Sequence, residues 1–325
     1  MNNRGLFLYC SLILVVSWTI QGCVIQIYGG PNAPAAVPWL LLLMFTPTLI
    51  TLGFILFSPP ARRSVRWKPS WSLIPSMFVA VVVPILIAFS VLALVEVFGW
   101  GKSGWFQFSP SGVHISGGPW LLGTGVQGWA KFVGNVLLTG SSYAALNSLA
   151  AVGEEFGWRG MLQGELVRRL GITRGIAVLG VIWAAWHAPS ILAGYNYPEH
   201  PVWGALVLFP LQLIAASYFL GWLAIRTGSF WAAAIAHGAV NSIQEGITAN
   251  LHMTAPHLYE DLARVGVTIV VGCLFWMLLR RRAAPPGSVS THIRDRRIGV
   301  RVDLTTATDE DLFHAKTGAK RFHDH

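Results

Sequence analysis

Long apolar runs recur along most of the chain and constrain its fold more than any other feature. A helix that crosses a bilayer needs about 20 mostly apolar residues, because lipid offers its backbone no hydrogen bonds. Only 11% of the residues are charged and 54% are hydrophobic, which is far more apolar than a soluble chain of this length. The sequence therefore predicts an all-α, polytopic membrane protein with about eight transmembrane helices. The expected spans are roughly 6–28, 36–57, 72–98, 131–153, 175–195, 202–225, 229–248 and 260–279.

Lysine and arginine residues alternate between the two sides of this topology. Because positive residues flanking a span stay on the cytoplasmic side, we expect a multi-pass protein of the cell membrane with both termini in the cytoplasm. We attribute the net charge of +9 to this bias and to contact with the lipid bilayer, and expect no nucleic-acid partner. The cytoplasmic side would hold Arg4, Arg62, Arg63, Arg66, Lys68, Arg168, Arg169, Arg174, Arg226 and Arg280 to Arg282, and the other side Lys102, Lys131 and Arg264.

The composition divides the chain into two parts. We expect residues 1–282 to form a membrane-embedded helical domain, with a functional core at about 130–250. From 283 onward the apolar period is lost, so 283–325 is predicted to be a flexible basic cytoplasmic tail. The external connection 99–130 is rich in Gly, Trp and Phe, and we expect its aromatic rings to lie on the headgroup layer as scaffold.

The charged residues that stand out lie at the end of the fourth span, where residues 152–160 read VGEEFGWRG. A charge within the bilayer costs about 2.5–3.5 kcal/mol on insertion scales, so each one requires a partner or a function. If the helix continues, Glu155 and Arg159 are four residues apart with the acid first, the order that favours an ion pair. Glu154 then projects about a quarter turn away and is free for another role.

Two histidines lie in later spans. His187 belongs to the string WAAWHAP in the fifth span, and His237 stands four residues before Asn241 in the seventh, so that both project from one helical face. Counting about 1.5 Å per residue from the nearest cytoplasmic arginine gives depths of roughly 21 Å for Glu154, 20 Å for His187 and 17 Å for His237. We therefore expect the three side chains to meet at one level.

The strings EEFGWRG, WAAWHAP and HGAVN resemble the three motifs of the CAAX protease and bacteriocin-processing family, also called the Abi family. This family includes the type II CAAX prenyl endopeptidase. The resemblance covers about residues 130–245, with Trp183 where Phe is commoner, and implies an intramembrane endopeptidase with eight helices. The catalytic residues that it implies are Glu154, Glu155, Arg159, His187, His237 and Asn241.

The sequence motifs of other classes of membrane protease are absent from the spans. It contains no His-Glu-x-x-His string, and its spans carry no Gly-x-Ser-Gly or Gly-Asp pair. We therefore expect Glu154 to be the general base, and His187 to orient and deprotonate the water. His237 and Asn241 would stabilise the oxyanion. Arg159 would neutralise Glu155.

The cofactor is left as none or Zn²⁺. Glu154, His187 and His237 would supply the three protein ligands of a catalytic zinc, with water in the fourth position. That arrangement would leave no free carboxylate to act as base. For this reason we favour a water activated by Glu154 without a metal, and keep zinc as the alternative.

Two other functions remain open. One is a catalytically idle relative that acts in bacteriocin self-immunity or as a membrane scaffold, and the other is a proton-coupled transporter, although no internal repeat supports it. The substrate of a protease would be a membrane-associated or prenylated protein or a peptide precursor, and composition does not choose among these. We expect it to enter from the cytoplasm or laterally between helices. Small residues that permit close helix contact there are Gly153, Gly157, Gly160 and Gly164.

Overall fold

The computed structural model describes residues 1–58, 62, 65–68 and 70–283. Residues Met1–Leu279 form one compact unit, and a second unit begins at Arg280. Arg63 of the predicted basic loop, and residues 284–325 of the predicted tail, lie outside the described residues.

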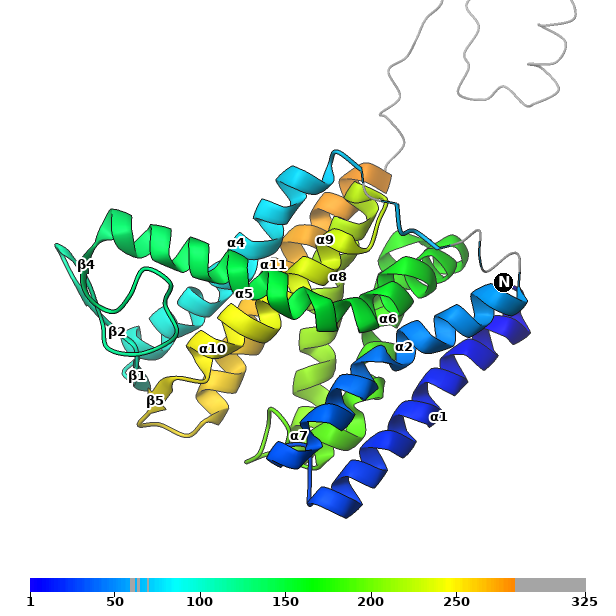
Figure 1. Cartoon of the computed structure of the whole chain (residues 1–325), viewed down its shortest axis with the longest axis horizontal. Coiled ribbons are helices and arrows are strands. Elements are labelled where there is room, and N and C mark those ends of the chain that lie inside the picture. The colour runs from blue at the N-terminus through cyan, green and yellow to red at the C-terminus, as the bar shows by residue number, and fades with distance from the viewer. Residues whose placement is uncertain (59–61, 63–64, 69, 284–325) are drawn as a thin grey trace, which may run out of the picture. The chain divides into compact units, whose positions relative to one another are not determined.

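Helices dominate the compact unit, as predicted, and α1 and α2 run side by side in it (Figure 1). The long apolar segments leave the chain no other way to satisfy its backbone in lipid. The helices are α1 (Asn3–Tyr28), α2 (Val37–Phe57), α4 (Leu73–Val97), α5 (Trp129–Gly157), α6 (Gln163–Leu192), α7 (Pro201–Trp203), α8 (Phe209–Thr227), α9 (Trp231–Ala239), α10 (Glu245–Thr248) and α11 (Leu258–Ala283). Short 3-10 or π-helical turns are η1 (Pro34–Ala36), η2 (Trp158–Leu162), η3 (Gly204–Leu208) and η4 (Val240–Gln244).

Six of the helical stretches in the described residues are long and apolar enough to cross a membrane. One of them, Trp129–Leu192, contains both the fourth and the fifth predicted spans. The seventh predicted span, 229–248, is divided among α9, η4 and α10, and none of these has the required length. The all-α, multi-pass membrane fold is therefore confirmed, and the number of eight spans stays a prediction.

Gly171 separates the two predicted spans within Trp129–Leu192. Its backbone angles, φ 76° and ψ 167°, are not helical, so α6 consists of a short segment before this residue and a long one after it. Glycine adopts a positive φ without the steric cost that a Cβ would add. The segment after Gly171 carries His187, and the segment that leads up to α6 carries the double Glu.

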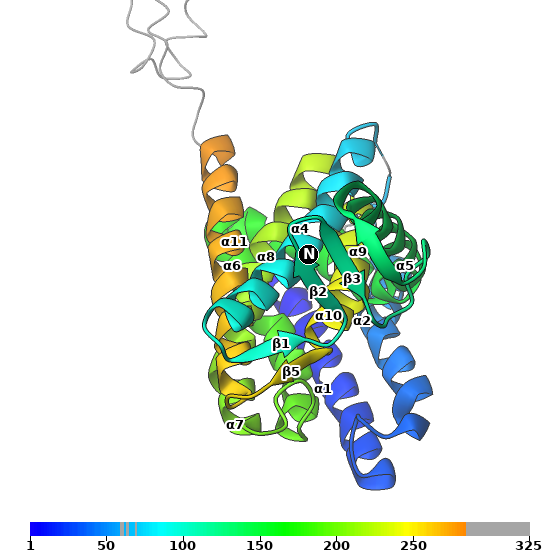
Figure 2. The same cartoon turned by 90° about the vertical axis from the view of Figure 1, so that its left-hand side faces the viewer.

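The connection 99–130, which the topology predicts to be external, contains strands that were not predicted from the sequence. The strands β2 (Phe106–Ser109), β3 (Gly112–Ile115) and β4 (Gly125–Gly128) form an antiparallel sheet, and β1 (Gly101–Ser103) pairs with β5 (Leu251–Met253) (Figure 2). Not all aromatic side chains of this connection are exposed, because Phe106 and Trp120 are buried in a hydrophobic core with residues of α4 and α5. Gly112 opens β3 where a Cβ would lie 2.1 Å from the carbonyl oxygen of Gln127.

Close glycine contacts fix the helices that carry the double Glu and His237. A Cβ on Gly238 of α9 would lie 2.6 Å from the carbonyl oxygen of Ala144 in α5. On the other face of α5, a Cβ on Gly153 or Gly157 would lie within 3 Å of the backbone of α2. The predicted tight packing holds for these two glycines, whereas Gly164 faces open space. Helix α5 therefore lies backbone to backbone against both α9 and α2.

Candidate active site

The double Glu lies where α5 passes into the π-helical turn η2, and its second member forms the predicted ion pair. Nη1 of Arg159 lies 2.7 Å from Oε1 of Glu155, and neither side chain has any exposed surface. Arg159 also donates a hydrogen bond to Oγ of Ser217 in α8, at 3.3 Å, and its guanidinium carbon lies 4.4 Å from the centroid of the Trp183 ring. The pair thus ties α5 to α6 and α8.

His237 joins the same ion pair, which the sequence reading did not predict. Its Nδ1 lies 3.0 Å from Oε1 of Glu155, the oxygen that also binds Arg159. A carboxylate can only accept, so Nδ1 carries the proton and Nε2 is the atom left for the pocket. We call Glu155, Arg159 and His237 the ion-pair layer. In this layer the single negative charge of Glu155 faces the guanidinium and the imidazole together.

Glu154 is held by two indoles. Its Oε2 accepts hydrogen bonds from Nε1 of Trp183, at 2.7 Å, and from Nε1 of Trp158, at 3.3 Å. The side chain is 2% exposed, yet it lines a pocket. The sequence reading treated Trp183 only as a replacement for Phe. A tryptophan in that place adds an N–H donor that phenylalanine lacks, and this was the signal that could have revealed the bond.

His187 is fixed in one tautomer by its own helix. Its Nδ1 lies 2.9 Å from the carbonyl oxygen of Trp183, four residues earlier. A carbonyl oxygen accepts only, so Nδ1 must donate, and in the neutral imidazole Nε2 then keeps its lone pair. The rings of Trp186 and Phe209 pack edge-on against the imidazole, with centroids 4.4 Å and 5.0 Å away. This environment orients Nε2 as a proton acceptor.

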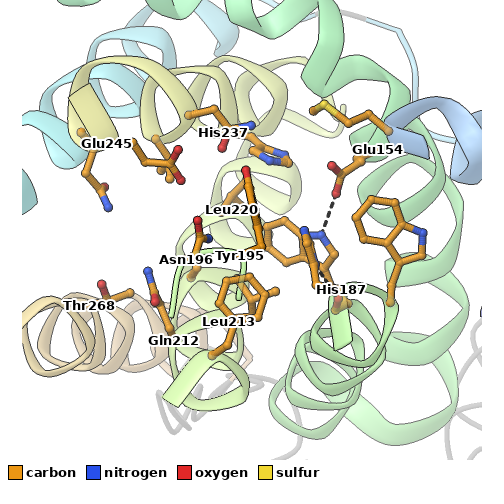
Figure 3. Close-up of a pocket in the computed structure, with 18 of the residues that line it drawn as sticks. Glu154, His187, Tyr195, Asn196, Gln212, Leu213, Leu220, His237, Glu245 and Thr268 are labelled. Carbon is orange, nitrogen blue, oxygen red and sulfur yellow. Dashed lines mark hydrogen bonds between the residues drawn. The ribbon is translucent and has the colours of Figure 1, made fainter. Parts of the chain in front are cut away.

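Four of the six predicted catalytic residues line one pocket. It encloses about 160 Å³, and its lining includes Glu154, His187 and His237 (Figure 3) as well as Asn241. These side chains come from α5, α6, α9 and η4. The carboxylate and both imidazoles thus lie around one pocket, as expected, and their catalytic roles stay a prediction. Glu155 and Arg159 do not line the pocket and belong to the ion-pair layer.

Asn241 reaches the pocket from a π-helical turn, although a regular α-helix was expected. Helix α9 ends at Ala239, and Asn241 is the second residue of η4. A π turn contains an extra residue and often occurs at functional sites. His237 and Asn241 still line the same pocket, as predicted from their spacing of four.

Further polar residues line the pocket that the sequence reading missed. Glu245 follows Asn241 by four residues within an apolar segment, so the rule applied to Glu154 could have identified it. Tyr195 lies in the pocket between Glu154 and Glu245 (Figure 3). Burial raises the pKa of Tyr195 to about 12, so its hydroxyl stays protonated at neutral pH. The other missed polar residues in the lining are Ser190, Asn196, Gln212, Gln244 and Thr268.

Helix α1 supports the helix that carries His187. Nε2 of Gln21 donates to the carbonyl oxygen of Trp186 at 2.8 Å, and its Oε1 accepts from both the backbone N–H and the hydroxyl of Ser190. Nε1 of Trp186 also donates to Oγ of Ser17. The first span is thus a packed part of the site, and its buried polar residues bracket the position of His187 in α6.

The pocket extends to connections that the topology assigns to the outside. Pro31 precedes α2, and Tyr195 and Asn196 lie in the connection after α6; all three line the pocket. With cytoplasmic termini, both connections lie on the outer side of the bilayer. The lining therefore does not favour the expected entry from the cytoplasm. The depth count missed this because it measured each residue from the cytoplasmic arginines and not from the nearer helix end at Leu192.

The proposed zinc ligands do not form a metal site in this arrangement. Within residues 1–58, 62, 65–68 and 70–283, no three His, Cys, Asp or Glu side chains converge as a bound metal would require. One oxygen of Glu154 accepts from two indoles, and Nδ1 of each histidine is used by a protein partner. Nε2 of each histidine and Oε1 of Glu154 carry no hydrogen bond among the described residues, and metal-binding histidines also use their second nitrogen in this way, so the metal requirement stays a question for experiment.

Fold and site together define a polytopic helical membrane protein in which a carboxylate and two imidazoles face one buried pocket. Residues 137–243 match the family model described as type II CAAX prenyl endopeptidase Rce1-like. The match contains all six predicted catalytic residues, from Glu154 to Asn241. The family resemblance predicted from the three motifs is therefore confirmed for this segment.

One curated relative supports the same assignment. The chain is 29% identical over 102 residues to CAAX prenyl protease 2 of Methanococcus maripaludis. The aligned segment makes up 30% of this chain and 37% of the relative. The similarity is therefore partial and leaves most of both chains outside it.

Proposed function

We propose that this protein is an intramembrane endopeptidase that hydrolyses a peptide bond of a membrane-associated or prenylated protein or of a peptide precursor. One observation carries the proposal: Glu154, His187, His237 and Asn241 line a single pocket inside the segment that matches a CAAX prenyl endopeptidase model. A transporter would also use buried ionisable residues, but it would not require an oxyanion donor beside a carboxylate base.

In the proposed reaction, Glu154 is the general base. A water between Glu154 and His187 gives a proton to the carboxylate, and its oxygen attacks the carbonyl carbon of the scissile bond. Nε2 of His187 accepts a hydrogen bond from the same water and aligns it. The protonated Glu154 then returns its proton to the leaving nitrogen, and the C–N bond breaks. General acid–base catalysis of this kind contributes about 10²–10⁴-fold to a rate.

The oxyanion is held by His237 and Asn241. The hydrogen bond from Nδ1 of His237 to Glu155 stabilises positive charge on the imidazole, and Nε2–H of that imidazolium can donate into the pocket. The amide of Asn241 supplies a second donor. Arg159 holds Glu155 in place and so acts as a positioning residue. This division of work gives each predicted residue one role.

Comparative proteomics of membranes tests the activity even while the substrate is unidentified. Membranes of cells that produce the wild-type protein are compared with membranes of cells that produce Glu154→Ala at equal abundance. We expect at least one membrane-associated precursor to accumulate uncleaved in the variant. A substrate set that does not differ between the two would contradict a protease and would favour an idle relative or a transporter.

Metal analysis tests the choice of chemistry. If zinc were present, Glu154, His187 and His237 would hold it, and the metal would supply Lewis-acid activation of water. We expect the purified active protein to contain less than stoichiometric zinc and to keep its activity in chelator. Stoichiometric zinc, lost together with activity in chelator, restored by add-back and absent from His187→Ala, would overturn the metal-free proposal.

We further propose that the protein lies in the cell membrane with both termini in the cytoplasm, as the alternating Lys and Arg clusters indicate. Reporter fusions after Arg66 and after Arg282 should give cytoplasmic signals. An external signal at either position would contradict this topology.

A further inference from the structure

The pocket has a second polar end that the proposed reaction does not use. Gln244 and Glu245 follow one another at the junction of η4 and α10, and both line the pocket together with Thr268 of α11. Figure 3 shows Glu245 and Thr268 at the same end. We call these three residues the acceptor end. In the close-up, Glu245 and Thr268 lie on the side of the pocket away from Glu154 and His187.

Each member of the acceptor end offers a hydrogen-bond acceptor. Gln244 is only 3% exposed, and its Oε1 is buried without a partner among the described residues. The hydroxyl of Thr268 donates its proton to the carbonyl oxygen of Arg264 at 2.7 Å, so only its lone pairs remain for the pocket. The carboxylate of Glu245 is an acceptor when ionised, and no described donor bonds to it.

The cations nearest to Glu245 already have other partners. Arg264 and His237 are the positive groups whose charge acts on Glu245. Arg264 pairs with Asp261 and lies over the ring of Tyr197, with 4.9 Å between the guanidinium carbon and the ring centroid. His237 bonds to Glu155. When Glu245 is ionised, it therefore adds a negative charge to the pocket, and no described contact neutralises that charge.

A ligand for this end must supply donors and positive charge. The carboxylate of Glu245 and the lone pairs of Thr268 match the N–H donors of a lysine ammonium group, and the amide oxygen of Gln244 is a third acceptor when it faces the pocket. Placing a cation there would also offset the energetic cost of a half-buried carboxylate that has no described donor. Resting on the proposed endopeptidase function, we propose that the acceptor end is a substrate subsite that binds a basic side chain, lysine first, at a position away from the scissile bond.

Asn196 supports the interpretation of this end as a binding region. It is the only non-glycine residue with a positive φ, 60°, among the described residues, and it lines the pocket. Asparagine tolerates this conformation better than most residues, and such conformations concentrate at ligand sites. The connection after α6 therefore presents Asn196 to the pocket in a conformation that few side chains adopt.

The test uses full-length protein in lipid nanodiscs and pairs of fluorescent peptides that differ by lysine or norleucine at one scanned position. Norleucine keeps a linear aliphatic side chain and removes the ammonium group. Binding is measured on Glu154→Gln, so that the readout does not depend on turnover. We expect lysine to be preferred at one position by about tenfold or more, the scale of one buried charge pair.

Substitutions at Glu245 identify the source of this preference. Adding Glu245→Gln should bring the lysine-to-norleucine ratio at that position close to one, whereas Glu245→Asp should retain part of it. Glu199→Gln is the matched control, because Glu199 is an exposed acid in the connection after α6 and does not line the pocket. Thr268→Val should lower the ratio without a change of charge. Thermal unfolding of each variant checks that it is folded.

Two outcomes would overturn the subsite. One is no preference for lysine at any position, and the other is a preference that Glu245→Gln leaves unchanged. Failure of the protease proposal would look different, because wild-type protein would cleave none of the peptides while the Glu245-dependent preference in binding persisted. Such a result would leave a basic-ligand site in a protein that does not hydrolyse peptides.

Discussion

Two polar regions contribute residues to the same pocket, and their carboxylates differ in whether they have a partner. In the ion-pair layer, Glu155 contacts Arg159 and His237 at 2.7 Å and 3.0 Å. At the acceptor end, Glu245 has no donor among the described residues. A buried charge is costly unless it is paired. The comparison indicates that the ion-pair layer is part of the fold, and it is the basis of our proposal that a ligand completes the acceptor end.

The largest effect on folding is expected from Arg159→Ala. It would leave the carboxylate of Glu155 buried without its guanidinium, and breaking such a pair costs about 3–5 kcal/mol. We expect a large drop in folded yield and in thermal stability in detergent, together with loss of activity. Arg159→Lys keeps the charge and should recover part of the stability. A fully stable Arg159→Ala would show that the pair is not desolvated and would remove the contrast between the two regions.

Gly157→Ala should have the second-largest effect on stability. Gly157 allows the close approach of α5 to α2 beside the ion-pair layer. A Cβ there would lie 2.6 Å from Cβ of Pro47 and 2.9 Å from its backbone. Overpacking of this kind costs about 1–3 kcal/mol. Gly164→Ala is the control, since Gly164 faces open space and should tolerate the methyl group. Equal stability of the two variants would contradict the close contact of α2 with α5.

Gln21→Leu should have a smaller effect on stability and a separate effect on activity. The amide makes hydrogen bonds to Trp186 and Ser190 on either side of His187, and one such bond contributes about 1 kcal/mol net. We expect a modest loss of melting temperature and a lower kcat, because His187 loses part of its support. Activity equal to wild type would mean that α1 packs against the site without positioning it.

The smallest effect on folding is expected from Glu245→Gln. Removing an unpaired charge strands no partner, so stability should change by about 0.5 kcal/mol or less, or rise slightly. The same thermal assay in detergent that is used for Arg159→Ala measures it. A loss as large as that of Arg159→Ala would mean that Glu245 belongs to the fold and would end the distinction between the two regions.

Patterns with a fixed spacing were the most predictable parts of the molecule. Apolar runs located the six helical stretches that are long enough to cross a membrane, and a separation of four residues located the pair of Glu155 and Arg159. The depth count brought Glu154, His187 and His237 to one pocket, because helical rise is nearly constant. It did not reveal on which side the pocket opens, since that depends on the connections after α1 and α6.

Features that depend on contacts between distant segments were not predictable. The bond from His237 to Glu155 depends on the close packing of α9 on α5, and the π turns η2 and η4 have no sequence marker. The strands of 99–130 were missed because their short segments were interpreted as aromatic anchors for the headgroup layer. Glu245 could have been found by applying the rule for buried charge to every span.

The most direct test of the central claim measures how much hydrolysis depends on the proposed proton acceptor, Glu154. A precursor identified in membranes is incubated in ¹⁸O-labelled water with purified wild-type protein and with Glu154→Gln, both in nanodiscs and in chelator. We predict that wild type places one ¹⁸O atom in the new carboxyl group, and that Glu154→Gln, folded to the same extent, cleaves about 10²–10⁴-fold more slowly. Cleavage by Glu154→Gln at the wild-type rate would contradict the assignment of Glu154 as the base that activates water.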